Sequence, residues 1–321
     1  MRVTDHSNFD MVRDAVQRSR DKMNTLQIQS VSMKKINTPS DDPVGTAKVL
    51  EVRTDRMNND QYQMNSKMAE TFLENTDSAL AEVSELVLRA KEIALGQSNS
   101  ATASDHTRLG VAEEVAQIFK QAIAVANRRV GDRYLFGGFK TQKPPIDADG
   151  RYHGDRGQMM VEIAKDVFLT MNIPGSEAFN TNAKPEWGQD LSRFNSSSEE
   201  GVPSTEGSLE NVNLFDELQN FRIALLTGNM EMIHDSLDRF DQLYSKIVST
   251  RTKLGSRLQG LASSMSMIDR QNLTNINLSS VLEDADMAHV STELNKEESI
   301  FKNSLMTSKR LIQPSLLDFL R

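Results

Sequence analysis

Apolar residues repeat at alternating spacings of three and four over two long stretches of this 321-residue chain. This spacing is typical of a helix that packs along another helix. The longer stretch comprises Met230, Ile233, Leu237, Phe240, Tyr244, Ile247, Arg251, Leu254, Leu258, Leu261, Met265 and Ile268. The shorter one comprises Phe9, Val12, Val16, Ser19, Met23, Leu26, Ser30 and Met33. We expect these helices to pair with each other or with other copies of the chain, so assembly is the function to look for.

Arg251 is a charged residue within the longer apolar stretch. We expect it either to pair with an acidic residue of a neighbouring helix or to lie where the helix pair opens to water. Snorkelling of its long side chain toward solvent is a third explanation.

Proline and aspartate mark the boundary between the first two predicted helices. The first helix, expected over residues 5–36, stops before Pro39, because a proline disfavours the helical conformation of the residue that precedes it. The Asp42-Pro43 pair then predicts a new helix, with the aspartate as its cap and the proline at its first position. This helix is expected to reach residue 95 and to form an antiparallel hairpin with another over residues 104–130.

The middle of the chain has a different character. Glycines and prolines punctuate short extended runs, and strands are predicted at residues 159–163 and 166–173. Residues 180–208 are rich in Asn, Ser, Gly, Pro and Glu and are predicted to form a loop or a weakly ordered connection, in which the single tryptophan, Trp187, pins a loop rather than binds a ligand. A fourth helix is expected from Leu209 to the break at Gly228-Asn229.

The apolar register of the long stretch fails after Ile268, where Asn272, Asn275 and Ser279 take the seam positions. Ser280, with Glu283 three residues later, has the pattern of a capping box and predicts that a new helix begins there. The apolar residues of this last helix are Met287, Val290, Leu294, Phe301 and Leu305.

The fold class expected from these patterns is mainly α with a small β insert. The N- and C-terminal segments are predicted to form a long antiparallel helical rod or bundle around a β-rich middle domain. The expected division comprises terminal helices over 1–42 and 270–321, a helical rod domain over 43–140 and 209–269, and a β-rich outer insert over 141–208.

Composition excludes several function classes. A net charge of −8 argues against nucleic acid as a partner, because nucleic-acid binding uses a basic patch. The absence of cysteine excludes disulfides, thiolate metal sites and cysteine nucleophiles. The charged first twenty residues do not resemble a signal peptide, and no apolar run approaches the roughly 20 residues of a membrane span. We expect a protein that binds no membrane and is cytoplasmic, or is exported without a cleaved apolar signal.

Three clusters of chemically active side chains have simpler structural explanations. Asp41-Asp42 is expected to cap a helix rather than to act as a catalytic pair. His153-Gly154-Asp155 is expected to form a turn, since Gly and Asp favour turns and no second histidine lies nearby. The acidic run 283–286 lacks the ligand pattern of a calcium loop. We therefore expect no catalytic, cofactor-binding or metal site.

Residues 34–43 read Lys-Lys-Ile-Asn-Thr-Pro-Ser-Asp-Asp-Pro, and this segment resembles the N-terminal signature of the flagellin superfamily. The form of the motif Pro39, Ser40, Asp41, Asp42 and Pro43 is similar to that of the hook-associated protein 3 branch. Further similar segments lie, in the family's order, at residues 1–4, 134–141 followed by Pro144-Pro145, 152–155, 172–175 with Phe179, and 282–286. The ending 316–321 is also similar to that of flagellin, so a minor or atypical flagellin is the alternative.

The resemblance implies a structural protein without cofactors, exported through the flagellar type III apparatus and located outside the cell at the hook–filament junction. It implies as partners further copies of the chain, hook-associated protein 1, flagellin and an export chaperone that binds the C-terminal helix. Two other hypotheses are an unrelated cytoplasmic coiled-coil adaptor and a carbohydrate- or peptide-cleaving enzyme within residues 141–208. The adaptor does not explain the β insert, and the enzyme lacks convergent titratable groups.

The outer apolar stretches are predicted to carry assembly and to order only on polymerisation, because such helices need a packed apolar face to be stable. This predicted assembly interface comprises Phe9, Val12, Val16, Met23, Leu26, Met33, Met287, Val290, Leu294, Phe301 and Leu305.

Overall fold

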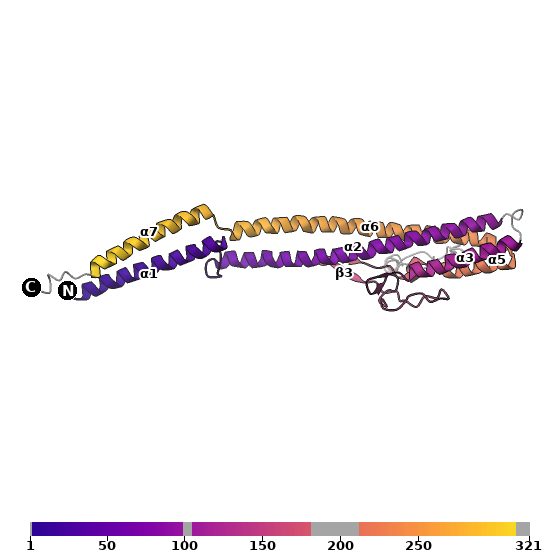
Figure 1. The fold of residues 1–321 in the computed structure, drawn as a ribbon, viewed down its shortest axis with the longest axis horizontal. Helices are drawn as coiled ribbons and strands as arrows, with labels where there is room; N and C mark the ends of the chain where they lie inside the picture. The colour runs from indigo at the N-terminus through magenta and orange to yellow at the C-terminus, as the bar shows by residue number, and fades with distance from the viewer. Residues whose placement is uncertain (1, 99–104, 181–211, 313–321) are drawn as a thin grey trace, which may run out of the picture. The chain divides into compact units, whose positions relative to one another are not determined.

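The computed structural model describes residues 2–98, 105–180 and 212–312, with the side chains of residues 2–9, 105–106 and 309–312 outside that description. Its helices are α1 (Arg2–Ser32), α2 (Pro43–Ser98), α3 (Asp105–Ala126), α4 (Gly175–Ala178), α5 (Leu214–Thr227), α6 (Met230–Glu283) and α7 (Met287–Ile312) (Figure 1). Its strands are β1 (Arg129–Val130), β2 (Arg133–Tyr134), β3 (Met160–Ala164) and β4 (Val167–Thr170). The predicted fold class, mainly α with a small β part, is confirmed.

The chain divides into two compact units. Unit 1 comprises Met1–Asp60 and Asp269–Arg321, and unit 2 comprises Gln61–Ile268. The expected division instead gave the rod domain a start at residue 43 and treated residues 141–208 as a separate insert. In the structure α2 and α6 each contribute residues to both units, and the β part belongs to unit 2.

The loop between α1 and α2 is fixed by its own aspartates. α1 ends at Ser32, four residues earlier than predicted, and Met33 takes a left-handed conformation with φ of 56°. Asp41 Oδ2 accepts hydrogen bonds from the backbone N–H groups of Asn37 (2.9 Å) and Thr38 (2.8 Å). These bonds lower the pKa of the Asp41 carboxyl group.

The predicted start of α2 is confirmed, with Pro43 as its first residue. Asp42 Oδ1 accepts a hydrogen bond from the backbone N–H of Gly45 at 2.9 Å and so acts as the expected cap.

The predicted helix start at Ser280 is wrong. α6 continues without a break to Glu283, and the Ser280 hydroxyl donates to the Asp284 carboxylate at its end. The cap of α7 is Asp286, whose Oδ1 accepts from the backbone N–H groups of Ala288 (2.9 Å) and His289 (3.2 Å). The loss of apolar periodicity at residues 272–279 does not end the helix. Polar contacts replace apolar ones there, since Asn272 accepts a hydrogen bond from Asn59 at 3.1 Å.

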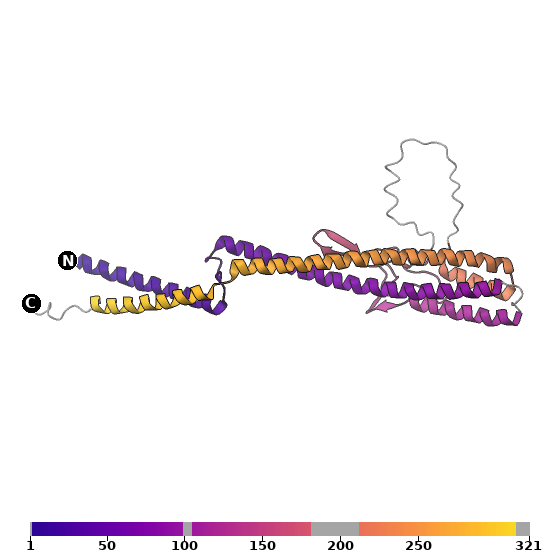
Figure 2. The same cartoon turned by 90° about the horizontal axis from the view of Figure 1, so that it is seen from above.

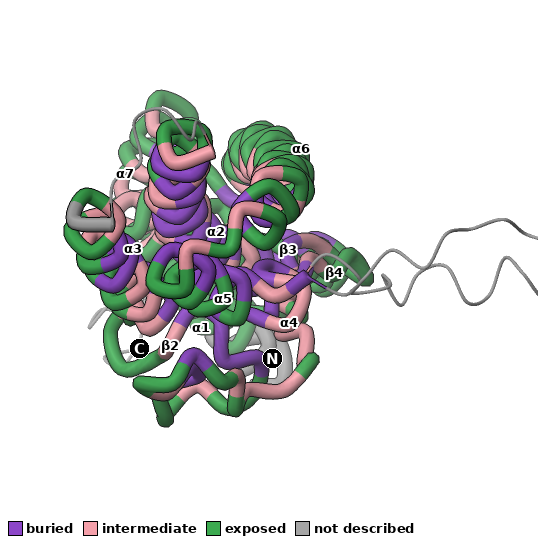
Figure 3. Tube along the Cα trace, turned by 90° about the vertical axis from the view of Figure 1, so that its right-hand side faces the viewer, coloured by how far each residue is buried: buried purple, intermediate pink, exposed green. Residues whose placement is uncertain are grey.

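Unit 2 contains the hydrophobic core. Buried residues of α2, α3, α5 and α6, purple in Figure 3, form one cluster. Within it the rings of Phe221 and Phe240 meet edge to face, with their centroids 5.4 Å apart. α3 lies beside α2 (Figure 2), and the Arg89–Glu114 ion pair at 2.7 Å joins the two helices, as the predicted hairpin requires. Of the three explanations for Arg251, the structure supports pairing with an acidic residue of a neighbouring helix. The Arg251 guanidinium donates two hydrogen bonds, of 2.9 Å and 3.2 Å, to the carboxylate of Asp77 in α2.

The β part of unit 2 consists of two antiparallel hairpins. β4 lies within the predicted strand 166–173, β3 extends one residue beyond the predicted strand 159–163, and the two pair Val161 with Leu169. The β1–β2 hairpin, with Gly131 at φ 59°, escaped prediction because two-residue strands carry no periodicity. α5 begins at Leu214 with Asn213 as its cap. Most of the predicted loop over 180–208, Trp187 included, and the predicted helix start at Leu209 lie outside the described residues.

Candidate functional site

The terminal helices α1 and α7 pack against each other within unit 1, as both views show (Figures 1 and 2). Most residues of the predicted assembly interface lie along their contact. Those that are partly or fully buried are Val12, Val16, Met23, Leu26, Met287, Val290, Leu294 and Phe301. Met33 and Leu305 are 64% and 46% exposed, and the side chain of Phe9 lies outside the described residues.

A buried polar contact interrupts the seam between α1 and α7. Glu297 of α7 is buried, accepts a hydrogen bond from the Ser19 hydroxyl at 3.3 Å and pairs with Lys22 Nζ at 2.6 Å. The hydrogen bond from Lys22 lowers the pKa of Glu297. Sequence reasoning missed Glu297, although its position between Leu294 and Phe301 continues the alternating spacing of three and four.

Glu283, at the end of α6, is the centre of an ionic cluster in unit 1. Its carboxylate, only 4% exposed, accepts two hydrogen bonds from the Arg53 guanidinium (2.8 Å and 3.1 Å), one from the Ser279 hydroxyl (3.2 Å) and one from Lys34. Burial by itself would raise the pKa of Glu283, but the hydrogen bonds from Arg53 and Lys34 outweigh it and lower that pKa to about 2.

Backbone hydrogen bonds join the same two segments. The N–H of Lys35 donates to the carbonyl of Glu283 at 2.6 Å, and the N–H of Ala285 donates to the carbonyl of Met33 at 3.0 Å. The beginning of segment 34–43 therefore lies against segment 282–286. Both segments resemble motifs of the flagellin superfamily.

Unit 1 buries little apolar surface. Among its described residues, only Val49, Val52 and Val290 are buried apolar side chains, whereas the remaining buried apolar residues lie in unit 2. Unit 1 exposes Met11, Ile28, Val31, Met33, Val44, Leu50, Met57, Leu273, Ile276, Leu278, Val281, Ile300, Leu305 and Met306. Where such side chains form a large contiguous patch, they mark a place where another molecule binds.

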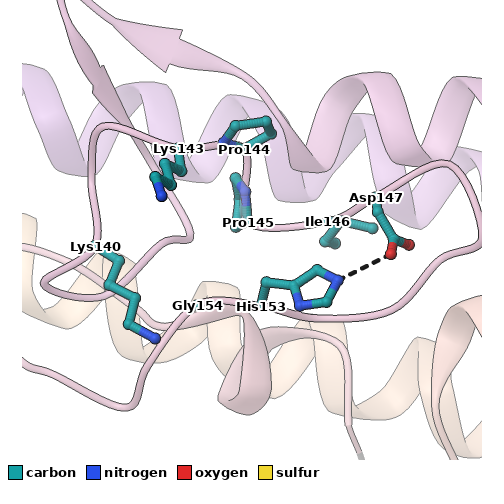
Figure 4. A pocket seen from close by; sticks show the side chains of 8 residues that line it. All are labelled: Lys140, Lys143, Pro144, Pro145, Ile146, Asp147, His153 and Gly154. Carbon is teal, nitrogen blue, oxygen red and sulfur yellow. Dashed lines mark hydrogen bonds and ion pairs between the residues drawn. The ribbon is translucent and has the colours of Figure 1, made fainter.

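The loop after β2 forms a half-open hollow of about 550 Å³ in unit 2 (Figure 4). His153 Nε2 contacts the carboxylate of Asp147 there at 2.8 Å, beside two lysines, Lys140 and Lys143. Asp155 instead accepts hydrogen bonds from the backbone N–H groups of Phe139 and Gly157, which is a turn-forming role. No group of three or more potential metal-binding side chains occurs among the described residues.

None of the described helices is long and apolar enough to cross a membrane.

The chain is similar to known flagellar proteins. Residues 9–141 match the model of the bacterial flagellin N-terminal helical region. Flagellar hook-associated protein 3 of Salmonella typhimurium is 26% identical over 274 residues, which are 82% of this chain and 81% of that protein. Flagellin of Listeria innocua is 22% identical over 306 residues, 95% of this chain and 94% of that protein.

The same fold occurs in a solved structure. The flagellar junction protein of Legionella pneumophila aligns with a TM-score of 0.53 at 16% identity, over 75% of this chain and all of that structure. Residues 9–141 thus match the flagellin N-terminal helical region, and over most of its length the chain is similar to hook-associated protein 3 of the flagellum.

Proposed function

We propose that the protein forms the junction layer between the flagellar hook and the flagellin filament, and that unit 1 is its assembly surface. The observation that carries this proposal is the contrast between the two units. Among the described residues, the two units expose equal numbers of large apolar side chains, but unit 1 buries only three apolar residues whereas unit 2 holds the rest of the buried core. The helices of unit 1 would therefore gain most of their apolar burial from neighbouring subunits.

The partners follow from the position of such a layer. Further copies of the chain would lie beside it, hook-associated protein 1 below and flagellin above, and an export chaperone would bind the last helix before secretion. Export through the flagellar type III apparatus would deliver the chain outside the cell. The role is structural, without catalysis.

A filament flagellin is the second candidate. The similarity to Listeria flagellin supports it, because that match covers more of the chain than the match to hook-associated protein 3, although at lower identity. Order of motifs and the junction-protein fold favour the first candidate.

A deletion strain separates the two. Loss of a junction protein leaves intact hooks and releases unpolymerised flagellin into the medium. If the filament alone is missing and hooks carry a complete junction, the protein is a flagellin.

Hydrogen exchange tests the role assigned to unit 1. In the free subunit, amides of residues 10–32 and 287–308 should exchange much faster than those of 235–261, and they should become protected in the assembled layer. Equal protection of the two regions in the free subunit would contradict ordering on assembly.

A further inference from the structure

The hollow after β2 is shaped in advance by hydrogen bonds within the chain. The Asn127 side chain donates to the Ile146 carbonyl at 2.7 Å and accepts from the Ile146 N–H at 3.0 Å. The N–H of His153 donates to the Pro145 carbonyl at 2.8 Å, and both Pro145 and Ile146 are buried. The hollow therefore keeps its shape without a ligand, as most binding sites do.

Two lysines at one end of the hollow are available to a carboxylate of another molecule. Lys140 and Lys143 are exposed and make no ion pair within the described part of the chain. The carboxylate of Asp147, toward the other end (Figure 4), is already engaged, because it accepts hydrogen bonds from two backbone N–H groups and contacts His153. The hollow thus offers positive charge beside apolar walls and is suited to an acidic partner.

The first turns of α6 carry the complementary charge. Glu231, Asp235 and Asp238 are exposed, are spaced by four and three residues, and so share one side of the helix over about 10 Å. Each is two residues, about 200° around the helix, from buried Ile233 or Phe240, so the three carboxylates point away from the core. They make no ion pair among the described residues. We call them the acidic stripe.

The hollow and the acidic stripe lie on opposite sides of unit 2. α6 runs along one side of the unit, and the loop after β2 lies on the other (Figures 1 and 3). The helices lie behind the hollow when it is seen from its open side (Figure 4). A copy bound at either surface therefore leaves the other surface uncovered, and the same contact can repeat from copy to copy.

We propose that neighbouring copies of this chain associate head to tail, with the acidic stripe of one copy seated at the hollow of the next, where its carboxylates pair with Lys140 and Lys143. Copies with a net charge of −8 repel one another elsewhere, so the positive hollow determines which face of the next copy is accepted. This inference rests on the proposed multi-copy layer and names a contact within it.

Cysteine cross-linking tests the contact, because the natural chain contains no cysteine. Full-length K143C and D235C, carrying different tags, are mixed at high concentration and oxidised. The mixed disulfide dimer should form several-fold faster than with the control pair K120C and D235C, in which Lys120 is an exposed residue of α3. Equal rates would overturn the contact. Faster linking of K143C to itself than to D235C would show a hollow-to-hollow contact and would also overturn it.

Charge reversal tests the same contact in cells of the deletion strain. The variants K140E/K143E and D235K/D238K should each lose most filaments, because like charges then meet. The combined variant K140E/K143E/D235K/D238K should regain them, since every hollow is then acidic, every stripe is basic and the net charge equals that of the natural chain.

A matched control separates the contact from a general effect of charge. K120E/K165E changes the net charge as much as K140E/K143E does, but both of its positions lie outside the hollow, so filaments should persist. Circular dichroism verifies that each purified variant is folded.

The outcomes distinguish this inference from the proposed function. If the deletion strain lacks filaments while folded K140E/K143E and D235K/D238K both support them, the head-to-tail contact is wrong and the junction role stands. If K140E/K143E alone loses filaments, the hollow binds another partner and the pairing is wrong. A folded and secreted combined variant that fails to restore filaments also overturns the pairing.

Discussion

Glu283 shows how a single carboxylate can control the contact between distant parts of the sequence. Its side chain is buried beside Arg53, and its backbone carbonyl holds the segment that follows α1. The motif similarity around residues 282–286 marked this position, but nothing in the sequence connected it with Arg53. Long-range pairs of this kind depend on tertiary packing, which local patterns do not encode.

Low pH should break the contacts of the Glu283 carboxylate with Arg53 and Lys34. Because the pKa of Glu283 in the folded protein is about 2, below its ordinary value of 4.5, the stabilisation is complete above pH 4.5 and is lost as the pH falls toward 2. Glu283→Gln should remove it at neutral pH, at a cost of about 2 kcal/mol. Hydrogen exchange of the Lys35 and Ala285 amides measures the effect. Glu298→Gln, a control whose side chain is 43% exposed and lies on α7, should leave both amides unchanged.

Gly45 provides a second test at the scale of one residue. A Cβ there would lie 2.4 Å from Asp42 Oδ2 and 2.7 Å from Ile36 Cδ1, so Gly45→Ala should displace the cap of α2 and destabilise the protein by about 1–2 kcal/mol. Gly255→Ala has open space and should stabilise it by up to about 1 kcal/mol. Urea denaturation compares the two. Stabilisation by both substitutions would show that the cap tolerates the methyl group.

The positions of the long helices could be predicted from the sequence, but only some of their ends could. The alternating apolar spacing indicated α6, and Asp42 with Pro43 indicated the start of α2. The continuation of α6 through Asn272 was missed, because polar residues that pair across a helix contact look like a break in an apolar pattern. The four-residue α4 and the strands β1 and β2 are too short for any periodicity.

The corrected boundary between α6 and α7 can be tested by removing each candidate cap. Asp286→Ala deprives the Ala288 and His289 amides of their acceptor and should destabilise α7 by about 1 kcal/mol. Ser280→Ala lies inside α6 and should change stability by less than about 0.5 kcal/mol. Exchange rates of amides 288–292 in the assembled layer report the difference. Larger loss from Ser280→Ala would restore the capping box.

The two units of the molecule differ in what stabilises them. The core of α2, α3, α5 and α6 side chains lies almost entirely in residues 61–268, so this part should fold without unit 1. We expect a fragment of residues 61–268 to unfold cooperatively, within a few degrees of the main transition of the full chain. Scanning calorimetry measures both. A fragment without a transition would show that unit 1 supports the core.

The apolar faces of unit 1 also determine how temperature acts on the layer. Covering them removes structured hydration, which lowers the heat capacity and makes subunit association entropy-driven near room temperature. This attraction weakens on cooling. A layer joined mainly through these faces would therefore loosen in the cold and tighten on mild warming.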